Sequence, residues 1–96
     1  MIFRIVKLEF REDSVQDFLT YIRPFQEAIR ASAGCTFLQI IQDNNNPQLI
    51  FTYSQWQSEQ DLENYRQSAL FTQVWAQTKR WFSAKPAAWT CISAFE

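Results

Sequence analysis

Residues 43–71 read DNNNPQLIFTYSQWQSEQDLENYRQSALF, a stretch in which a turn signal and a strand signal follow one another directly. The Asn44–Pro47 cluster predicts a turn, because asparagine tolerates left-handed backbone and Pro47 fixes its own φ while donating no hydrogen bond. The eight residues Leu49–Trp56 are rich in β-branched and aromatic side chains, which suit a pleated, half-buried surface. They therefore predict a strand.

Two serines mark the starts of the helices expected after this strand. The Ser58 hydroxyl can accept a hydrogen bond from the free amides of a first helical turn, and Glu59 and Asp61 place negative charge where the helix dipole favours it. Ser68 repeats the arrangement before a second apolar helical segment that includes Leu70. The stretch thus predicts a turn, a strand and two consecutive helices.

Residues 2–10 predict the first strand, and its apolar side chains fall in both alternating sets. One set holds Val6, Leu8 and Phe10, and the other holds Phe3 and Ile5. Because successive side chains of a strand point to opposite faces, both faces of this strand need to be covered.

A helix is expected next, beginning at Asp13 or Ser14 with a capping-box partner three residues later. Pro24 removes one backbone donor inside this segment and predicts a bend or short break. Gly34 is the only glycine in the chain, and it predicts the end of the helix, where left-handed backbone is often required.

Two more strands complete the predicted order. Residues 35–42 form the second strand, which the Asn44–Pro47 turn joins to the third as a hairpin, and Trp89–Phe95 forms the last. The order β-α-β-β-α-β is that of a ferredoxin-like, split β-α-β domain. We therefore expect one α+β domain over residues 1–96, with a four-stranded antiparallel sheet and helices on one face.

Composition excludes several classes of partner. The net charge is −1 and no lysine and arginine cluster is present, which argues against nucleic acid. No apolar run approaches the roughly 20 residues of a membrane span, and the N-terminus lacks a signal-peptide pattern. Cys35 and Cys91 could form a disulfide, but without a secretory signal we expect two reduced thiols in the cytoplasm.

The absence of histidine from the sequence narrows the possible chemistry. It removes the commonest metal ligand and the usual general base near neutral pH. The two cysteines are far apart in the sequence, and the carboxylates occur singly or at element ends, where capping and solvation explain them. No glycine-rich loop is present to hold a phosphate. We expect no metal and no cofactor, and we exclude a conventional hydrolase, kinase or dehydrogenase.

Several motifs together resemble the antibiotic biosynthesis monooxygenase (ABM) family. They are Asn-Asn-Pro at 45–47, Phe-Thr-Tyr-Ser-x-Trp-x-Ser-Glu at 51–59, and Leu-Glu-Asn-Tyr-Arg-x-Ser-x-x-Phe at 62–71. The Gly34-Cys35 and Lys85-Pro86 pairs also fit, so the resemblance extends over nearly the whole chain. It implies a ferredoxin-like fold that dimerises through its sheets into a dimeric α+β barrel.

The resemblance also implies a ligand pocket between the helices and the sheet. The candidates to line it are Val6, Leu8, Tyr53, Tyr65, Arg66, Phe71 and Trp75. The available hydrogen-bond donors are Tyr53, Tyr65, Arg66 and Lys7. The aromatic members of this set can equally be ordinary core, and Trp56 is expected to be a packing anchor. No catalytic residue is identified.

One branch of the family degrades haem. The resemblance places Val6, Tyr65 and Trp75 where that branch has its catalytic asparagine, its tryptophan and its iron-ligating histidine. Since the chain contains no histidine that could ligate iron, haem degradation is rejected.

A second branch oxidises quinols without metal or flavin, because an ionised, electron-rich phenol can itself pass an electron to oxygen. Such an enzyme needs a dry aromatic cavity and hydrogen bonds to the substrate anion. Many members carry a histidine in the helix segment that ends Ser-x-x-Phe, where this chain has Ala69 and Leu70. The resemblance to this branch gives our first hypothesis, which is a cofactor-independent monooxygenase-like protein acting on a small aromatic or quinol compound.

Two other hypotheses stay open. The chain can be a catalytically inactive, dimeric module that binds a small ligand, or a structural or stress-associated dimer with a filled pocket. A cavity of several hundred Å³ beneath Tyr65 and Trp75 would favour a ligand.

A homodimer packed sheet against sheet is also expected. The helices of so short a chain cover one face of the sheet, which leaves large side chains such as Phe3 and Ile5 on the other. Each contributes roughly 1.5–3 kcal/mol when buried. A second copy offers the same apolar patch, so a two-fold symmetric pairing covers both.

Overall fold

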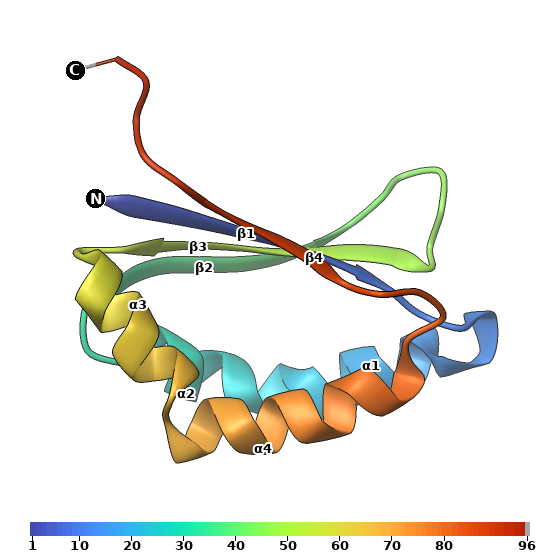
Figure 1. Ribbon diagram of the computed structural model, residues 1–96. Coiled ribbons are helices and arrows are strands. Elements are labelled where there is room, and N and C mark those ends of the chain that lie inside the picture. Colours follow the sequence, from blue (N-terminus) through green and yellow to red (C-terminus); the bar gives the residue numbers. More distant parts are fainter. Residues whose placement is uncertain (96) are drawn as a thin grey trace.

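The computed structural model describes residues 1–95 as a four-stranded sheet with a layer of helices on one face (Figure 1). The strands are β1 (Ile2–Glu9), β2 (Cys35–Gln42), β3 (Leu49–Trp56) and β4 (Ala87–Cys91). Their order across the sheet is β2-β3-β1-β4, and every neighbouring pair is antiparallel. The predicted ferredoxin-like α+β fold is confirmed.

The helices are α1 (Val15–Ile22), α2 (Gln26–Arg30), α3 (Glu59–Arg66) and α4 (Ala69–Thr78). A 3₁₀ segment, Arg23–Phe25, separates α1 from α2. Pro24 lies inside it and has no amide hydrogen to donate, so the predicted break at this proline is confirmed. Within residues 1–95, no helix combines the length and the apolar character needed to cross a membrane.

The serine caps differ between the two halves of the chain. Ser58 Oγ accepts from the Asp61 amide, and Ser68 Oγ accepts from the Phe71 amide, each at 3.1 Å, as predicted. Ser14 does not cap α1: its hydroxyl donates to the Asp13 carboxylate at 3.1 Å. The reason is that Ser14 already has helical backbone, as the last residue of a 3₁₀ turn that begins at Glu12.

The turn between β2 and β3 uses side-chain hydrogen bonds rather than left-handed backbone. No residue other than glycine has a positive φ within the described chain. The Asp43 carboxylate instead accepts from the amides of Asn45 and Asn46 at 3.0 and 2.8 Å. Left-handed backbone occurs at Gly34, where φ is +84° and a Cβ would collide with the Asp61 side chain, so glycine is required there. This glycine does not end the helix as predicted: α2 ends at Arg30 with Ala31 as its C-cap, and Gly34 lies in the turn that leads into β2.

The last strand is shorter and lies earlier than the predicted Trp89–Phe95. β4 pairs with β1 from Lys7–Ala87 to Phe3–Cys91. Because β1 begins at Ile2, residues beyond Cys91 soon run past the end of their partner strand. Figure 1 shows this C-terminal segment leaving the sheet on the side away from the helices.

The two faces of the sheet therefore have different surroundings. On the helix face, Phe10 is 0% exposed and stacks on Phe18 of α1 with ring centroids 4.4 Å apart. On the other face, which we call the open face, Phe37, Ile41 and Trp89 are 42%, 45% and 49% exposed. Within one copy the helices cover only the first of these faces (Figure 1).

Candidate functional site

A cavity of about 90 Å³ lies between the sheet and the helices. Its sheet-side lining consists of Arg4, Val6, Leu8, Leu38, Ile40, Thr52, Ser54 and Trp56. Its helix-side lining consists of Phe18, Ile22, Ile29, Leu62, Tyr65, Arg66, Phe71, Val74, Trp75 and Thr78. The volume exceeds what one water molecule needs but does not reach the several hundred Å³ of a drug-sized site. The size that would favour a ligand is therefore not met by this cavity.

Six of the seven pocket residues predicted from the sequence line this cavity: Val6, Leu8, Tyr65, Arg66, Phe71 and Trp75. Tyr53 does not. Its ring packs edge-on against Phe37 at 5.8 Å on the open face, and its hydroxyl accepts from Gln55 Nε2 at 3.0 Å. The reason is alternation along β3, whose neighbouring residues Thr52 and Ser54 are the ones that face the cavity.

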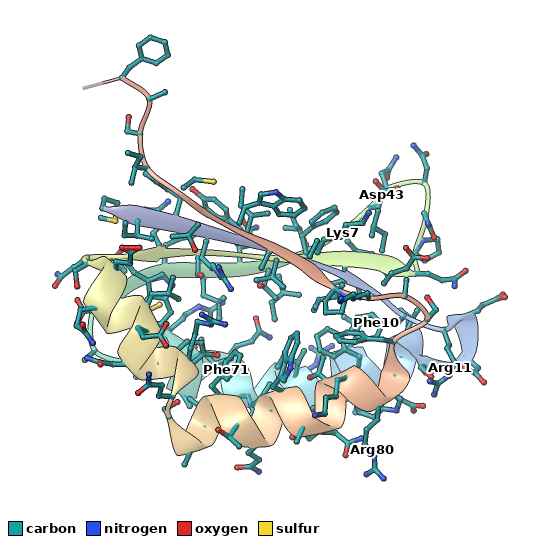
Figure 2. The ribbon with its side chains drawn as sticks, viewed as in Figure 1. Lys7, Phe10, Arg11, Asp43, Phe71 and Arg80 are labelled. Carbon is teal, nitrogen blue, oxygen red and sulfur yellow. The ribbon has the colours of Figure 1, made fainter. Side chains whose placement is uncertain are left out.

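Lys7, another expected donor, also lies outside the cavity. It falls between Val6 and Leu8, which both line the cavity, so alternation directs it to the opposite face. Figure 2 shows Lys7 on the open side of the sheet and Phe71 on the helix side. Neither Lys7 nor Tyr53 can donate to a ligand in this cavity.

One wall of the site is a continuous row of aromatic rings. Tyr65 stacks on Trp56 with centroids 5.0 Å apart, and Phe71 meets Tyr65 edge-on at 5.3 Å. Phe71 then stacks on Trp75 at 5.7 Å, and Trp75 meets Phe82 edge-on at 5.6 Å. Phe71 thus lies between Tyr65 and Trp75 and touches both. Tyr65, Phe71 and Trp75 each pack against two other rings of this row, so the wall is rigid and flat-sided.

Trp56 anchors this wall to the sheet. It is 1% exposed, and its indole Nε1 donates to Ser54 Oγ at 2.9 Å. Both side chains are on the cavity face of β3, so the hydrogen bond satisfies two buried polar groups at once.

Tyr65 is a hydrogen-bond donor rather than a base. Burial, and secondarily the nearby Cys35, raise its pKa to about 12, so the phenol stays protonated at neutral pH. Its hydroxyl forms no hydrogen bond with another residue within 1–95.

Arg4 is a site residue that sequence reasoning missed. It belongs to the same alternating set as Val6 and Leu8, so the strand pattern already contained the signal. One guanidinium nitrogen, Nη1, donates to Thr90 Oγ1 at 2.7 Å. Burial first, and then the charge of Arg66, lower the pKa of Arg4, while Glu63 opposes the shift.

Thr78 is a second residue that the predicted pocket omitted. It lies on the apolar face of α4, lines the cavity and is 2% exposed. Its Oγ1 has no hydrogen-bond partner in the described part of the chain. Buried hydroxyls are normally satisfied, so this group is free to bond to a ligand or a water molecule.

The lining has donors but no side-chain base. Among the described residues that form it there is no aspartate, glutamate, cysteine or histidine. Residues 1–95 also contain no group of three or more such side chains that could hold a metal ion. The site thus offers apolar rings and hydrogen-bond donors, but its lining has no carboxylate, thiolate or imidazole that could take a proton.

The sequence profile of one family, antibiotic biosynthesis monooxygenase, matches residues 1–77. The chain belongs to this ABM family. No curated protein matches the chain in sequence.

Solved structures agree in fold with this ABM protein. A Nitrosomonas europaea protein assigned to the same family superimposes with a TM-score of 0.91 at 16% identity, covering 99% of this chain and 100% of that one. Another antibiotic biosynthesis monooxygenase gives 0.92 at 14% identity, covering 98% and 99%. A conserved protein of Methanosarcina mazei Go1 gives 0.88 at 18% identity, covering 95% and 91%. At these identities the likeness concerns the fold alone.

Proposed function

We propose that this ABM protein is a cofactor-independent monooxygenase-like protein that acts on a small aromatic or quinol compound. The observation that carries the proposal is the aromatic cavity itself. A flat ring can lie against Phe71 and Trp75, while Tyr65 and the two arginines donate to its oxygen atoms. A largely apolar site with preorganised donors supports the proposal, because an oxygenation driven by the substrate's own electrons needs hydrogen bonds to the substrate anion.

The reaction balances without a cofactor. The ionised substrate passes one electron to oxygen, and the resulting radical pair combines to form a peroxide on a ring carbon that still bears hydrogen. Loss of water from this peroxide leaves a carbonyl group on that carbon. One oxygen atom enters the product and the other leaves as water, with all electrons supplied by the substrate.

A second candidate is a dimeric module that binds the same class of compound without turning it over. The observation in its favour is the lack of a base: the cavity lining contains no carboxylate or histidine, and Tyr65 keeps its proton. The first candidate therefore requires that the substrate ionise by losing its proton to water.

The proposal includes a homodimer formed through the open face. Phe37, Ile41 and Trp89 are each more than two-fifths exposed there, a concentration of apolar surface that normally marks an interface. Two identical patches related by a two-fold axis cover one another. It also includes a cytoplasmic location, supported by Cys35 and Cys91 being free thiols rather than a disulfide.

Aerobic oxygen uptake with a panel of hydroquinones and electron-rich phenols tests the activity. We expect uptake well above the uncatalysed rate. Val6→Phe, which fills the cavity, should lower it tenfold or more, and Ala76→Phe, on the exposed side of α4, should leave it unchanged. Adding catalase is the decisive control, because an oxidase that makes hydrogen peroxide returns half of the oxygen and an oxygenase returns none.

The other outcomes are equally informative. Binding of these compounds without oxygen uptake would favour the binding module. Oxygen recovered by catalase would contradict monooxygenation. Neither uptake nor binding would favour the structural dimer with a filled pocket.

A further inference from the structure

The cavity lining carries more positive charge than the surrounding residues neutralise. Arg4 and Arg66 both line it, and the lining includes no acidic residue among those described. Arg66 pairs with Glu63 at 3.4 Å, and its side chain is 44% exposed. Arg4 is half-buried and forms no ion pair within residues 1–95. Arg4 thus has no direct ion-pair partner in the described part of the chain, and Glu63 acts on it only from a distance.

The guanidinium of Arg4 is partly withdrawn from water, and the hydration it loses must be replaced by other polar contacts. The hydrogen bond from Arg4 to Thr90 uses one of five N–H donors and brings no negative charge. Burial and the neighbouring Arg66 lower the pKa of Arg4, while Glu63 opposes the shift, so the net effect disfavours this charge. An anion beside the two arginines would offset both unfavourable effects.

The rest of the cavity defines what that anion is attached to. Phe71 and Trp75 present stacked rings. The buried hydroxyl of Thr78 also lines the cavity and has no partner among the described residues. The complementary ligand is a flat apolar ring with a negatively charged oxygen.

We propose that the cavity takes an aromatic compound bearing an anionic oxygen, either a carboxylate or an ionised phenol, bound by Arg4 and Arg66 with its ring against Phe71 and Trp75. The inference rests on the proposed function and specifies the substrate class. It also accounts for a site without a base: two guanidinium groups stabilise the ionised form of a phenol, whose proton passes to water while both arginines keep theirs. Charge-assisted hydrogen bonds of this kind are stronger than neutral ones.

Matched probes test the inference without requiring turnover. Benzoate and benzamide have the same ring and differ in charge, so calorimetric titration of the protein with each isolates the anionic oxygen. We expect benzoate to bind at least tenfold more tightly than benzamide. Arg4→Gln and Arg66→Gln should each weaken benzoate binding about tenfold and leave benzamide unchanged.

Arg80→Gln is the matched control, because it removes the same charge from an exposed residue outside the cavity. Figure 2 shows Arg80 on the outer side of the helix layer. Its benzoate affinity should equal that of the unaltered protein. Circular dichroism checks the fold of each variant, and should Arg4→Gln fail to fold, the exposed Arg66 still carries the test.

4-Nitrophenol separates the two sources of the anion. Its absorbance reports ionisation, and binding beside two arginines should lower its apparent pKa in the unaltered protein but not in the Arg4→Gln, Arg66→Gln double variant. A shift supports an ionised phenol, and a benzoate preference without a shift supports a carboxylate.

Equal affinity for benzoate and benzamide, or no binding of either benzoate or 4-nitrophenol, would overturn the inference. These outcomes are distinct from the test of activity. Failure of oxygen uptake would leave a benzoate preference standing. Oxygen uptake with no preference for the anion would overturn this inference alone.

Discussion

The helix face and the open face of the sheet have nearly the same apolar sequence pattern but different surroundings. Along β1, Val6 and Leu8 point to the helices, while Phe3 and Ile5 point the other way. The helix face becomes a core around Phe10, which is fully buried, and contains the cavity. The open face keeps its large side chains partly exposed. An apolar strand pattern thus predicts that a face needs cover, but it does not say whether helices, a ligand or a second copy supplies it.

Two tyrosines, Tyr53 and Tyr65, show the same difference in surroundings between the two faces. Tyr53 lies on the open face, where its hydroxyl accepts a hydrogen bond from Gln55. Tyr65 lies on the helix side of the sheet, where burial raises its pKa to about 12. The difference follows from position in the tertiary structure, since both rings occur in similarly aromatic stretches of sequence.

The largest expected effect is the difference in unfolding free energy between a substitution on the helix face and one on the open face. Phe10→Ala removes a ring stacked on Phe18 and should cost about 3–5 kcal/mol of unfolding free energy, because it leaves a cavity in a packed core. Phe37→Ala, at a ring that is 42% exposed, should cost the monomer less than about 1 kcal/mol. Urea unfolding of dilute protein measures both. Equal losses would mean that the two faces are equally packed.

The next effect concerns association through the open face. Sedimentation should give about twice 11.4 kDa at micromolar concentration for the unaltered protein. Ile41→Asp should raise the dimer dissociation constant at least 100-fold, since each copy loses about 1.5–3 kcal/mol of apolar burial and places a charge in the interface. Gln73→Asp, on the exposed surface of α4, serves as the control. A monomeric unaltered protein would contradict the dimer.

A smaller effect follows from the raised pKa of Tyr65. The folded state keeps the phenol protonated up to about pH 12, whereas the unfolded chain releases this proton near pH 10. The unfolded state is therefore favoured as pH rises through this window, and up to about 2 kcal/mol of stability is lost. Tyr65→Phe should flatten the loss between pH 10 and 12 relative to the unaltered protein, and Tyr53→Phe should not. Identical pH profiles for all three proteins would contradict the burial of Tyr65.

The smallest effect compares two buried hydroxyls on the helix face. Thr78→Val replaces an unpartnered hydroxyl by a methyl group of the same shape and should stabilise the ligand-free protein by about 0.5–1 kcal/mol. Ser54→Ala removes the acceptor for the Trp56 indole and should destabilise by about 1 kcal/mol. Thermal unfolding measures both. A loss of stability in Thr78→Val would show that the hydroxyl has a partner.

Local signals account for how much of the fold could be predicted. The caps at Ser58 and Ser68 each depend on residues within one turn, so short-range chemistry is enough. The helix end predicted at Gly34 was wrong, because α2 already ends at Arg30 and Gly34 directly precedes β2. The predicted end of the last strand was wrong, because the end depends on where its partner β1 begins, more than 80 residues away in the chain. The Asn44–Pro47 turn was predicted at the right place. Its predicted left-handed backbone was wrong, since hydrogen bonds to the Asp43 carboxylate stabilise the turn instead.

The sequence by itself determined the elements, their order and the two alternating sets of each strand, because propensity, capping and side-chain alternation are properties of neighbouring residues. Only the tertiary structure decided which set faces the helices. That decision excluded Tyr53 and Lys7 from the cavity and placed Arg4 in it. It also brought Arg4 and Arg66 to one cavity from distant positions in the chain. The electrostatic character of the site follows from this long-range packing, which no local pattern encodes.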